Sequence, residues 1–174
     1  YLPGMFRTHK RAIKEKDLPI PEEKVQIYLE AIRFFTEIGY VMIGMDHYAL
    51  PGDELALALK KRTLHRNFMG YTTIHNMAQI GVGVSAISDF GVSYWQNNKD
   101  IYQYINETFN KIHNPRRGIK LDKEDQLRRE VIETLMCHGE IYIPDFETRY
   151  EINFKEHFNS AWPELEKFAQ EGLV

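Results

Sequence analysis

Gly39-Tyr40-Val41-Met42-Ile43-Gly44 is the stretch that decides the fold. Its apolar, partly β-branched residues lie between two glycines, which predicts a short strand buried on both faces. Residues 21–38 precede it with a helical spacing of apolar side chains, and Pro21 suits the first helical position. The expected apolar stripe of this helix is Val25, Tyr28, Leu29, Ile32 and Phe35. A helix, a tight turn and a buried strand make one repeat of an α/β layer.

The next residues carry polar groups. Asp46 and His47 follow the predicted strand directly, at the carboxyl end where parallel sheets and barrels place their chemistry. A carboxylate beside an imidazole could bind polar substrate groups or exchange protons. A purely structural hydrogen-bonding role is the alternative, because adjacent residues at a strand end can point apart.

Three segments follow between residues 53 and 90. Asp53 is expected to cap a short helix that runs to about Lys61. Residues 62–76 lack a steady apolar period and are rich in polar side chains, so they predict an ordered polar loop. The glycines, small residues and β-branched residues of 80–90 predict a strand or a close-packed backbone run.

From Asn97 onward the apolar period becomes helical and strands are expected largely to disappear. This shift predicts two domains, residues 1–96 and residues 97–174. The expected helices are 100–111, 123–137 with Asp122 as cap, a short one capped by Asp145, 154–161 and 163–171, and Arg116-Arg117-Gly118 is expected to form a hinge-like loop. Successive helices ending where a β-wing could begin suggest a winged-helix-like subdomain. The predicted fold class is α+β, mostly helical.

Composition excludes several classes of function. Lysine and arginine total 22 against 25 aspartate and glutamate, and this formal charge of -3 argues against nucleic acid as a partner. The basic residues near 116–129 alternate with acidic ones, as on a solvated, salt-bridged helix face. No apolar run approaches the roughly 18–20 residues that span a bilayer, so no membrane partner is expected and a cytoplasmic location is predicted.

The metal and phosphate signals are weak. Cys137 is the one cysteine and lies among apolar neighbours, so it predicts a core residue rather than a ligand or nucleophile. His65 and His75 are ten apart with no patterned cysteine or carboxylate, which does not indicate a metal site. Gly81 and Gly83 lack the third glycine of a dinucleotide fingerprint, but they allow close approach of the backbone to another segment or to a flat cofactor.

Three runs, 44–49, 64–73 and 81–88, resemble in order and spacing the oxygen-independent coproporphyrinogen III oxidases of heme biosynthesis, a radical S-adenosylmethionine (SAM) family. The resemblance implies the last βα unit of a partial (β/α) barrel followed by a helical domain. It also implies oxidative decarboxylation of two propionates of coproporphyrinogen III to vinyl groups, after a SAM-derived radical abstracts a propionate hydrogen.

The family's Cys-x3-Cys-x2-Cys loop, which holds a 4Fe–4S cluster, does not occur in this sequence. The chain opens at Tyr1, as expected of a piece of a longer polypeptide whose N-terminal barrel domain would be its partner. SAM and the cluster are therefore expected in the parent protein. This chain alone is expected to bind neither of them and to be catalytically inert.

The resemblance also implies site residues. Ile87 corresponds to a hydrophobic residue that lines a second SAM site, and it is the one cofactor-binding residue expected here. The candidates for the substrate site are Asp46, His47, Arg66, Asn67 and Met69. The family usually has glutamine where this chain has Met69, and methionine cannot supply the directed hydrogen bonds of an amide. No catalytic residue and no metal ligand is predicted.

Two alternatives remain. Heme-binding relatives share the architecture without the decarboxylase activity, but their loop typically reads His-Asn-x-x-Tyr-Trp where residues 65–72 read His-Arg-Asn-Phe-Met-Gly-Tyr-Thr. The other alternative is a free-standing winged-helix interaction module, which salt-sensitive DNA binding would support.

Overall fold

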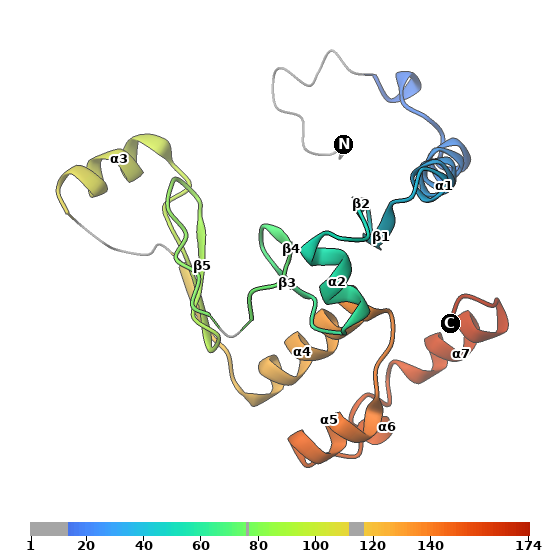
Figure 1. Ribbon diagram of the computed structural model, residues 1–174. Helices are drawn as coiled ribbons and strands as arrows, with labels where there is room; N and C mark the ends of the chain where they lie inside the picture. Colours follow the sequence, from blue (N-terminus) through green and yellow to red (C-terminus); the bar gives the residue numbers. More distant parts are fainter. Residues whose placement is uncertain (1–13, 76, 112–116) are drawn as a thin grey trace. The chain divides into compact units, whose positions relative to one another are not determined.

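The computed structural model describes residues 14–75, 77–111 and 117–174 (Figure 1). The chain divides into two compact units, residues 1–60 and 61–174, which are described separately. Helices dominate and the strands form small antiparallel sheets, so the predicted α+β, mostly helical class is confirmed. Of the predicted elements, Arg116, Asn76 at the end of the predicted loop 62–76, and parts of the two domain ranges lie outside the described residues.

The first unit contains one long helix and a β-hairpin. Its elements are η2 Glu15–Asp17, α1 Pro21–Glu37, β1 Val41–Gly44, β2 His47–Ala49 and α2 Glu54–Lys60. The helix α1 begins at Pro21, whose fixed φ suits the first turn and whose missing N–H would have no partner there. It ends before Gly39, which has φ +92°, the left-handed conformation that favours glycine. The predicted helix and both of its end signals are confirmed.

The strand β1 pairs differently from the prediction. It runs antiparallel to β2, with Val41 opposite Ala49 and Met42 opposite Tyr48. The chain can reverse here because Gly44 and Met45 both have positive φ, which makes a tight turn. Within β1 only Ile43 is buried, at 3% exposure, so the prediction of a strand buried on both faces is wrong for the described residues.

Aromatic packing and a backbone bond join α1 to this hairpin. The Phe35 ring stacks on the Tyr48 ring with centroids 4.6 Å apart, and the Tyr28 hydroxyl donates to the Met45 carbonyl oxygen at 3.1 Å. In α2 the Asp53 carboxylate accepts from the Leu55 amide at 2.8 Å. The predicted cap is therefore confirmed, because Asp53 satisfies an amide that the first helical turn leaves free.

The second unit contains a β-hairpin, a three-stranded sheet and most of the helices. Its elements are β3 His65–Asn67, β4 Gly70–Thr72, β5 Ile87–Asp89, β6 Ser93–Gln96, α3 Ile101–Phe109, β7 Arg117–Lys120, α4 Lys123–His138, α5 Ile143–Tyr150, α6 Phe154–His157 and α7 Trp162–Gln170.

The segment predicted as a polar loop is the hairpin β3–β4. Asn67 lies opposite Gly70, so only two residues form the turn between the strands. The Asn67 side-chain oxygen accepts from the Met69 amide at 2.8 Å, and Gly70 takes φ +136°. The loop prediction is therefore wrong: a side-chain-to-backbone bond and a glycine close the turn, and strand pairing satisfies the backbone of the polar residues.

Strands also continue beyond Asn97. The sheet has the order β5-β6-β7 with antiparallel neighbours, and β7 includes Arg117 and Gly118. The predicted hinge-like loop is wrong for these two residues. A side chain at Gly118 would come within 3.3 Å of the Trp95 ring, so glycine lets β7 pass close to the indole on β6.

The helical prediction after residue 97 holds with two exceptions: α6 ends at His157, short of the predicted residue 161, and α5 begins differently. The helix α4 opens with a capping box, because Asp122 and Asp125 each accept a bond from the other's backbone amide, at 2.8 and 3.1 Å. The helix α5 begins at Ile143 with Pro144 in its first turn, so Asp145 lies inside the helix and its predicted role as cap is wrong. Proline suits that first turn, which explains the earlier start.

The core of the second unit's helical part lies between α4, α5 and α6. Leu127, Phe146 and Phe154 are buried there, and the Phe146 and Phe154 rings meet edge to face with centroids 5.9 Å apart. Tyr150, Phe158 and Trp162 pack around these three. Within the described part of the chain, no helix combines the length and apolar character needed to cross a membrane.

Cys137 lies buried on α4, at 3% exposure, so its prediction as a core residue is confirmed. Burial, with Glu133 nearby, raises the pKa of its thiol from 9.0 to about 11. Two pKa units mean roughly 100-fold less thiolate at neutral pH. We expect Ellman's reagent to react at least that much more slowly with the folded chain than with the chain unfolded in urea. Equal rates would contradict the buried position.

Candidate functional site

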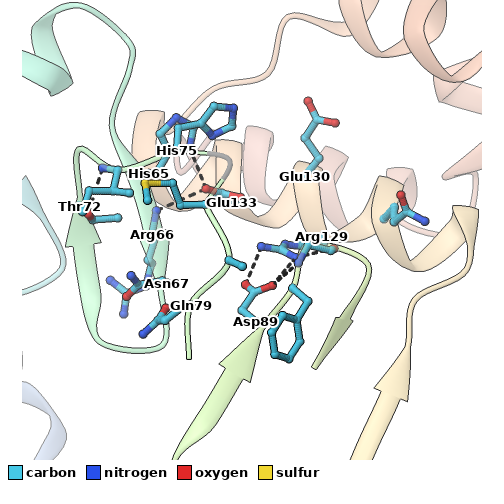
Figure 2. A pocket seen from close by; sticks show the side chains of 16 residues that line it. His65, Arg66, Asn67, Thr72, His75, Gln79, Asp89, Arg129, Glu130 and Glu133 are labelled. Atoms are coloured by element: carbon cyan, nitrogen blue, oxygen red, sulfur yellow. Dashed lines mark hydrogen bonds and ion pairs between the residues drawn. The ribbon is translucent and has the colours of Figure 1, made fainter. Parts of the chain in front are cut away.

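A cavity of about 670 Å³ lies in the second unit (Figure 2). The hairpin β3–β4, the segment that follows it, the end of β5 and one face of α4 supply its walls. The polar side chains that line it include His65, Arg66, Asn67, His75, Asp89, Arg129 and Glu133. Both charge signs are present, so the cavity suits a ligand with several polar groups rather than a simple apolar molecule.

Glu133 on α4 fixes the first strand of the hairpin. Its Oε1 lies 3.0 Å from Nδ1 of His65 and accepts from the Arg66 amide at 3.4 Å. On the other side, the His65 ring stacks on the His75 ring with centroids 3.8 Å apart. One carboxylate therefore orients both the His65 ring and the Arg66 backbone amide, and His75 covers one face of that ring.

The stacked histidines give a testable pH dependence. Burial and the neighbouring His65 lower the pKa of His75 below its ordinary value of 6.5. Between those two pKa values the unfolded chain binds more protons at this site than the folded chain, so acidification through this window reduces the free energy of unfolding. We expect an NMR titration to place the His75 midpoint below 6.5, with His75→Gln identifying its resonance. A midpoint above 6.5 would contradict this expectation.

Arg66 combines a held side chain with a free hydrogen-bond donor. Its guanidinium lies 4.8 Å above the centroid of the Tyr71 ring. Its Nη1 atom is buried and has no hydrogen-bond partner among the described residues. A buried donor without a partner costs free energy, and a carboxylate is the acceptor that a guanidinium binds best. Arg66 is thus the best-placed cation for an acidic ligand group.

Asn67 and Met69 lie at the end of the hairpin. Asn67 lines the cavity, but its side-chain oxygen is already bonded to the Met69 amide. Met69 is 84% exposed and does not line the cavity. The structure therefore brings Arg66 and Asn67 together at one wall, and it places Met69 at the exposed tip beyond them.

Ile87 begins β5, which a close backbone contact holds in place. A side-chain carbon at Gly81 would lie 2.5 Å from the Ile87 carbonyl oxygen, so only glycine fits there. The side-chain amide of Asn97 donates to the carbonyl oxygens of Gly81 and Gly83 at 3.1 and 3.0 Å. The prediction of a close-packed backbone run is confirmed for this segment, and β5 itself covers only its last residues.

Asp46 and His47 belong to the first unit. The Asp46 carboxylate lies 2.9 Å from Nδ1 of His47 and is exposed. Asp46 occupies the hairpin turn and His47 begins β2, so neither stands at the end of a parallel strand as predicted. The carboxylate and the imidazole thus contact each other within the hairpin, and their part in binding substrate stays a prediction.

Sequence reasoning missed Asp89, Arg129 and Glu133. Asp89 and Arg129 form an ion pair across 40 residues of sequence, and Glu133 reaches back 68 residues to His65. The available signal for Asp89 was that it is the one charged residue in the stretch 80–90, because a charged group in such a segment needs a partner when it is buried.

The chain's residues do not fit a 4Fe–4S cluster. Such a cluster needs several thiolates, and Cys137 is the one cysteine and is buried. The described ranges also bring no three His, Cys, Asp or Glu side chains into a group that could hold a metal ion.

Comparisons with known proteins agree on one family. Residues 121–174 match the family model described as the HemN C-terminal domain. The chain is 43% identical over its whole length to the oxygen-independent coproporphyrinogen III oxidase of Pseudomonas aeruginosa and 41% identical to that of Escherichia coli, and it covers 38% of each. It thus spans about two fifths of the length of these relatives.

A solved structure agrees with these sequence matches. The Escherichia coli coproporphyrinogen III oxidase, described as a radical SAM enzyme, matches with a TM-score of 0.91 and 42% identity. The match covers 99% of this chain and 40% of that one. The chain is therefore similar over its whole length to the C-terminal portion of the oxygen-independent coproporphyrinogen III oxidases, and its residues 121–174 match the HemN C-terminal domain.

Proposed function

We propose that this chain is the C-terminal part of an oxygen-independent coproporphyrinogen III oxidase. The parent protein would oxidatively decarboxylate two propionates of coproporphyrinogen III to vinyl groups and give protoporphyrinogen IX. The observation that carries this proposal is the match over the whole chain, in sequence and in fold, to enzymes with that name. A cytoplasmic location remains a prediction.

The cavity offers groups that suit such a substrate. Coproporphyrinogen carries several propionates, and the free Nη1 donor of Arg66 is the kind of group that binds a carboxylate. Asn67 lies beside it and can donate through its side-chain amide. Their role is to hold a propionate in one orientation, which lowers the entropic cost of the reaction.

Ile87 is the proposed contact with SAM. It is half-buried at the start of β5 and offers an apolar surface to a flat or methylated group. SAM and a 4Fe–4S cluster, held by the rest of the parent protein, would supply the radical that abstracts hydrogen. The resemblance implies glutamine at the position of Met69. A methionine side chain cannot donate a hydrogen bond to SAM, so its contact with SAM at this tip would rest on apolar packing.

An anaerobic assay of the full-length protein tests the proposal. We expect SAM-dependent conversion of coproporphyrinogen III to protoporphyrinogen IX, with two molecules of carbon dioxide released per substrate. Arg66→Gln should raise the KM for coproporphyrinogen about tenfold or more, because a charge-assisted bond is lost. Arg62→Gln is the matched control, since Arg62 pairs with Glu140 on the surface. Heme binding without any turnover would replace the proposal by a non-catalytic relative.

A further inference from the structure

Arg129 connects the matched C-terminal domain to the cavity wall opposite it (Figure 2). From α4, its Nη2 donates to Oδ2 of Asp89 at 2.8 Å and its Nη1 to Oδ1 at 3.2 Å. The two side chains are only 31% and 11% exposed. This two-point geometry fixes orientation as well as distance, which a single-point ion pair does not.

Asp89 is itself held firmly within β5. Its backbone exchanges two hydrogen bonds with Gln79, at 2.7 and 2.8 Å, and its carboxylate accepts from the Gly91 amide at 2.8 Å. Arg129 also donates to the Gly91 carbonyl oxygen at 2.9 Å. The guanidinium therefore holds both the end of β5 and the turn after it.

The same strand carries Ile87. Ile87 and Asp89 are two residues apart, so their side chains leave the same face of the strand. A shift of Asp89 along or across the strand would move Ile87 with it, because the strand is short and paired with β6 over all three of its residues.

Arg129 is also linked to the tip of the hairpin β3–β4 through two aromatic side chains. Its guanidinium lies 5.2 Å from the centroid of the Tyr94 ring, and the Tyr94 ring meets the Phe68 ring edge to face at 5.2 Å. Phe68 directly precedes Met69 in the turn of the hairpin. One side chain thus contacts the strand that carries Ile87 and, through one ring, the turn that carries Met69.

We infer that Arg129 is a positioning residue that sets β5 and the hairpin tip for contact with SAM. This inference rests on the proposed function, because that function assigns SAM contact to Ile87. Lysine cannot replace Arg129, since a single ammonium cannot bond both carboxylate oxygens and the Gly91 carbonyl in the same plane.

The test uses the full-length protein with Arg129→Ala, Arg129→Lys and the control Arg128→Ala. Arg128 is the neighbouring arginine, but it pairs with Glu124 on its own helix. We expect the KM for SAM to rise about tenfold in Arg129→Ala and less in Arg129→Lys, because small displacements cost rate steeply. The KM for coproporphyrinogen and the values for Arg128→Ala should stay within about twofold of the wild type.

Hydrogen exchange supplies a readout that needs no turnover. The bonded amides of Gln79 and Asp89 should exchange about tenfold faster in Arg129→Ala than in the wild type, as expected when a local tie is lost. Arg129→Lys keeps the charge and most of the side-chain volume but loses the two-point pairing with Asp89. If Arg129→Ala is unstable, this variant shows the effect of the lost pairing without the effect of unfolding.

Each outcome decides the inference. Faster exchange with a raised KM for SAM supports it. Unchanged exchange, an unchanged KM for SAM, or equal rises in the KM for both substrates would overturn it. If the wild type shows no turnover, the proposed function fails. The Kd for SAM, measured by equilibrium dialysis, then replaces the KM for SAM. An unchanged Kd in Arg129→Ala overturns the inference.

Discussion

Leu127→Ala should lower the free energy of unfolding of the second unit by about 2–5 kcal/mol, the cost of emptying a well-packed core site. Leu127 is 2% exposed and lies in the core with Phe146 and Phe154. These three side chains come from three helices, so no single helix can move to fill the space. Urea unfolding, followed by circular dichroism, measures the change.

Ile132→Ala is the matched control for this substitution. Ile132 lies on the same helix but is 60% exposed, so its truncation removes few contacts and leaves no cavity. We expect a change of less than about 1 kcal/mol, as for most exposed positions. Equal losses in the two variants would contradict the assignment of the core to the side of α4 that carries Leu127.

Gly81→Ala should give the second large effect. The added carbon would lie 2.5 to 2.9 Å from three backbone atoms of Ile87, and backbone atoms cannot rotate away as a side chain can. Either the 81–83 segment or β5 must move, and such overpacking costs roughly 1–3 kcal/mol. Because Ile87 itself would be displaced, we also expect SAM-dependent activity of the full-length protein to fall at least tenfold.

Gly52→Ala provides the control. A carbon added at Gly52 meets nothing within 4 Å, and the residue does not have a positive φ. Its stability should therefore stay within about 0.5 kcal/mol of the wild type. Normal stability and activity in Gly81→Ala would contradict the claim that the close contact between Gly81 and Ile87 fixes β5.

Local signals predicted most helices of the fold. Pro21 and Gly39 mark the two ends of α1, and Asp122 marks the start of α4, because each acts on amides or dihedrals within a few residues. The hairpin β3–β4 was missed for the opposite reason. Its two strands are short and mostly polar, and they lack the alternation of apolar and polar residues that marks a half-buried strand. The sequence pattern therefore does not distinguish them from a loop.

The strand β7 shows a second limit. All four of its residues are exposed, so burial leaves no alternating pattern, and the strand exists because it pairs with β6. Pairing between distant segments decides such elements, and local propensity cannot report it. The error at Asp145 has a local cause instead: Pro144 suits the first turn and the helix begins before the residue that carries the capping signal.

The candidate site was predicted in part. Arg66 and Asn67 were chosen from the sequence and do line one cavity, whereas Glu133 and Arg129 were not. Both missed residues lie on α4 and act on partners 40 or more positions earlier in the chain. No spacing rule joins such positions, so only the fold shows that α4 supplies a wall of the cavity.

The coding sequence upstream of Tyr1 tests most directly whether this chain is the C-terminal part of a radical SAM oxidase. We predict an open reading frame, continuous with Tyr1, that encodes a Cys-x3-Cys-x2-Cys loop able to hold the cluster that this chain's single cysteine cannot. A start codon close to Tyr1, with no such loop in the reading frame, would contradict the account.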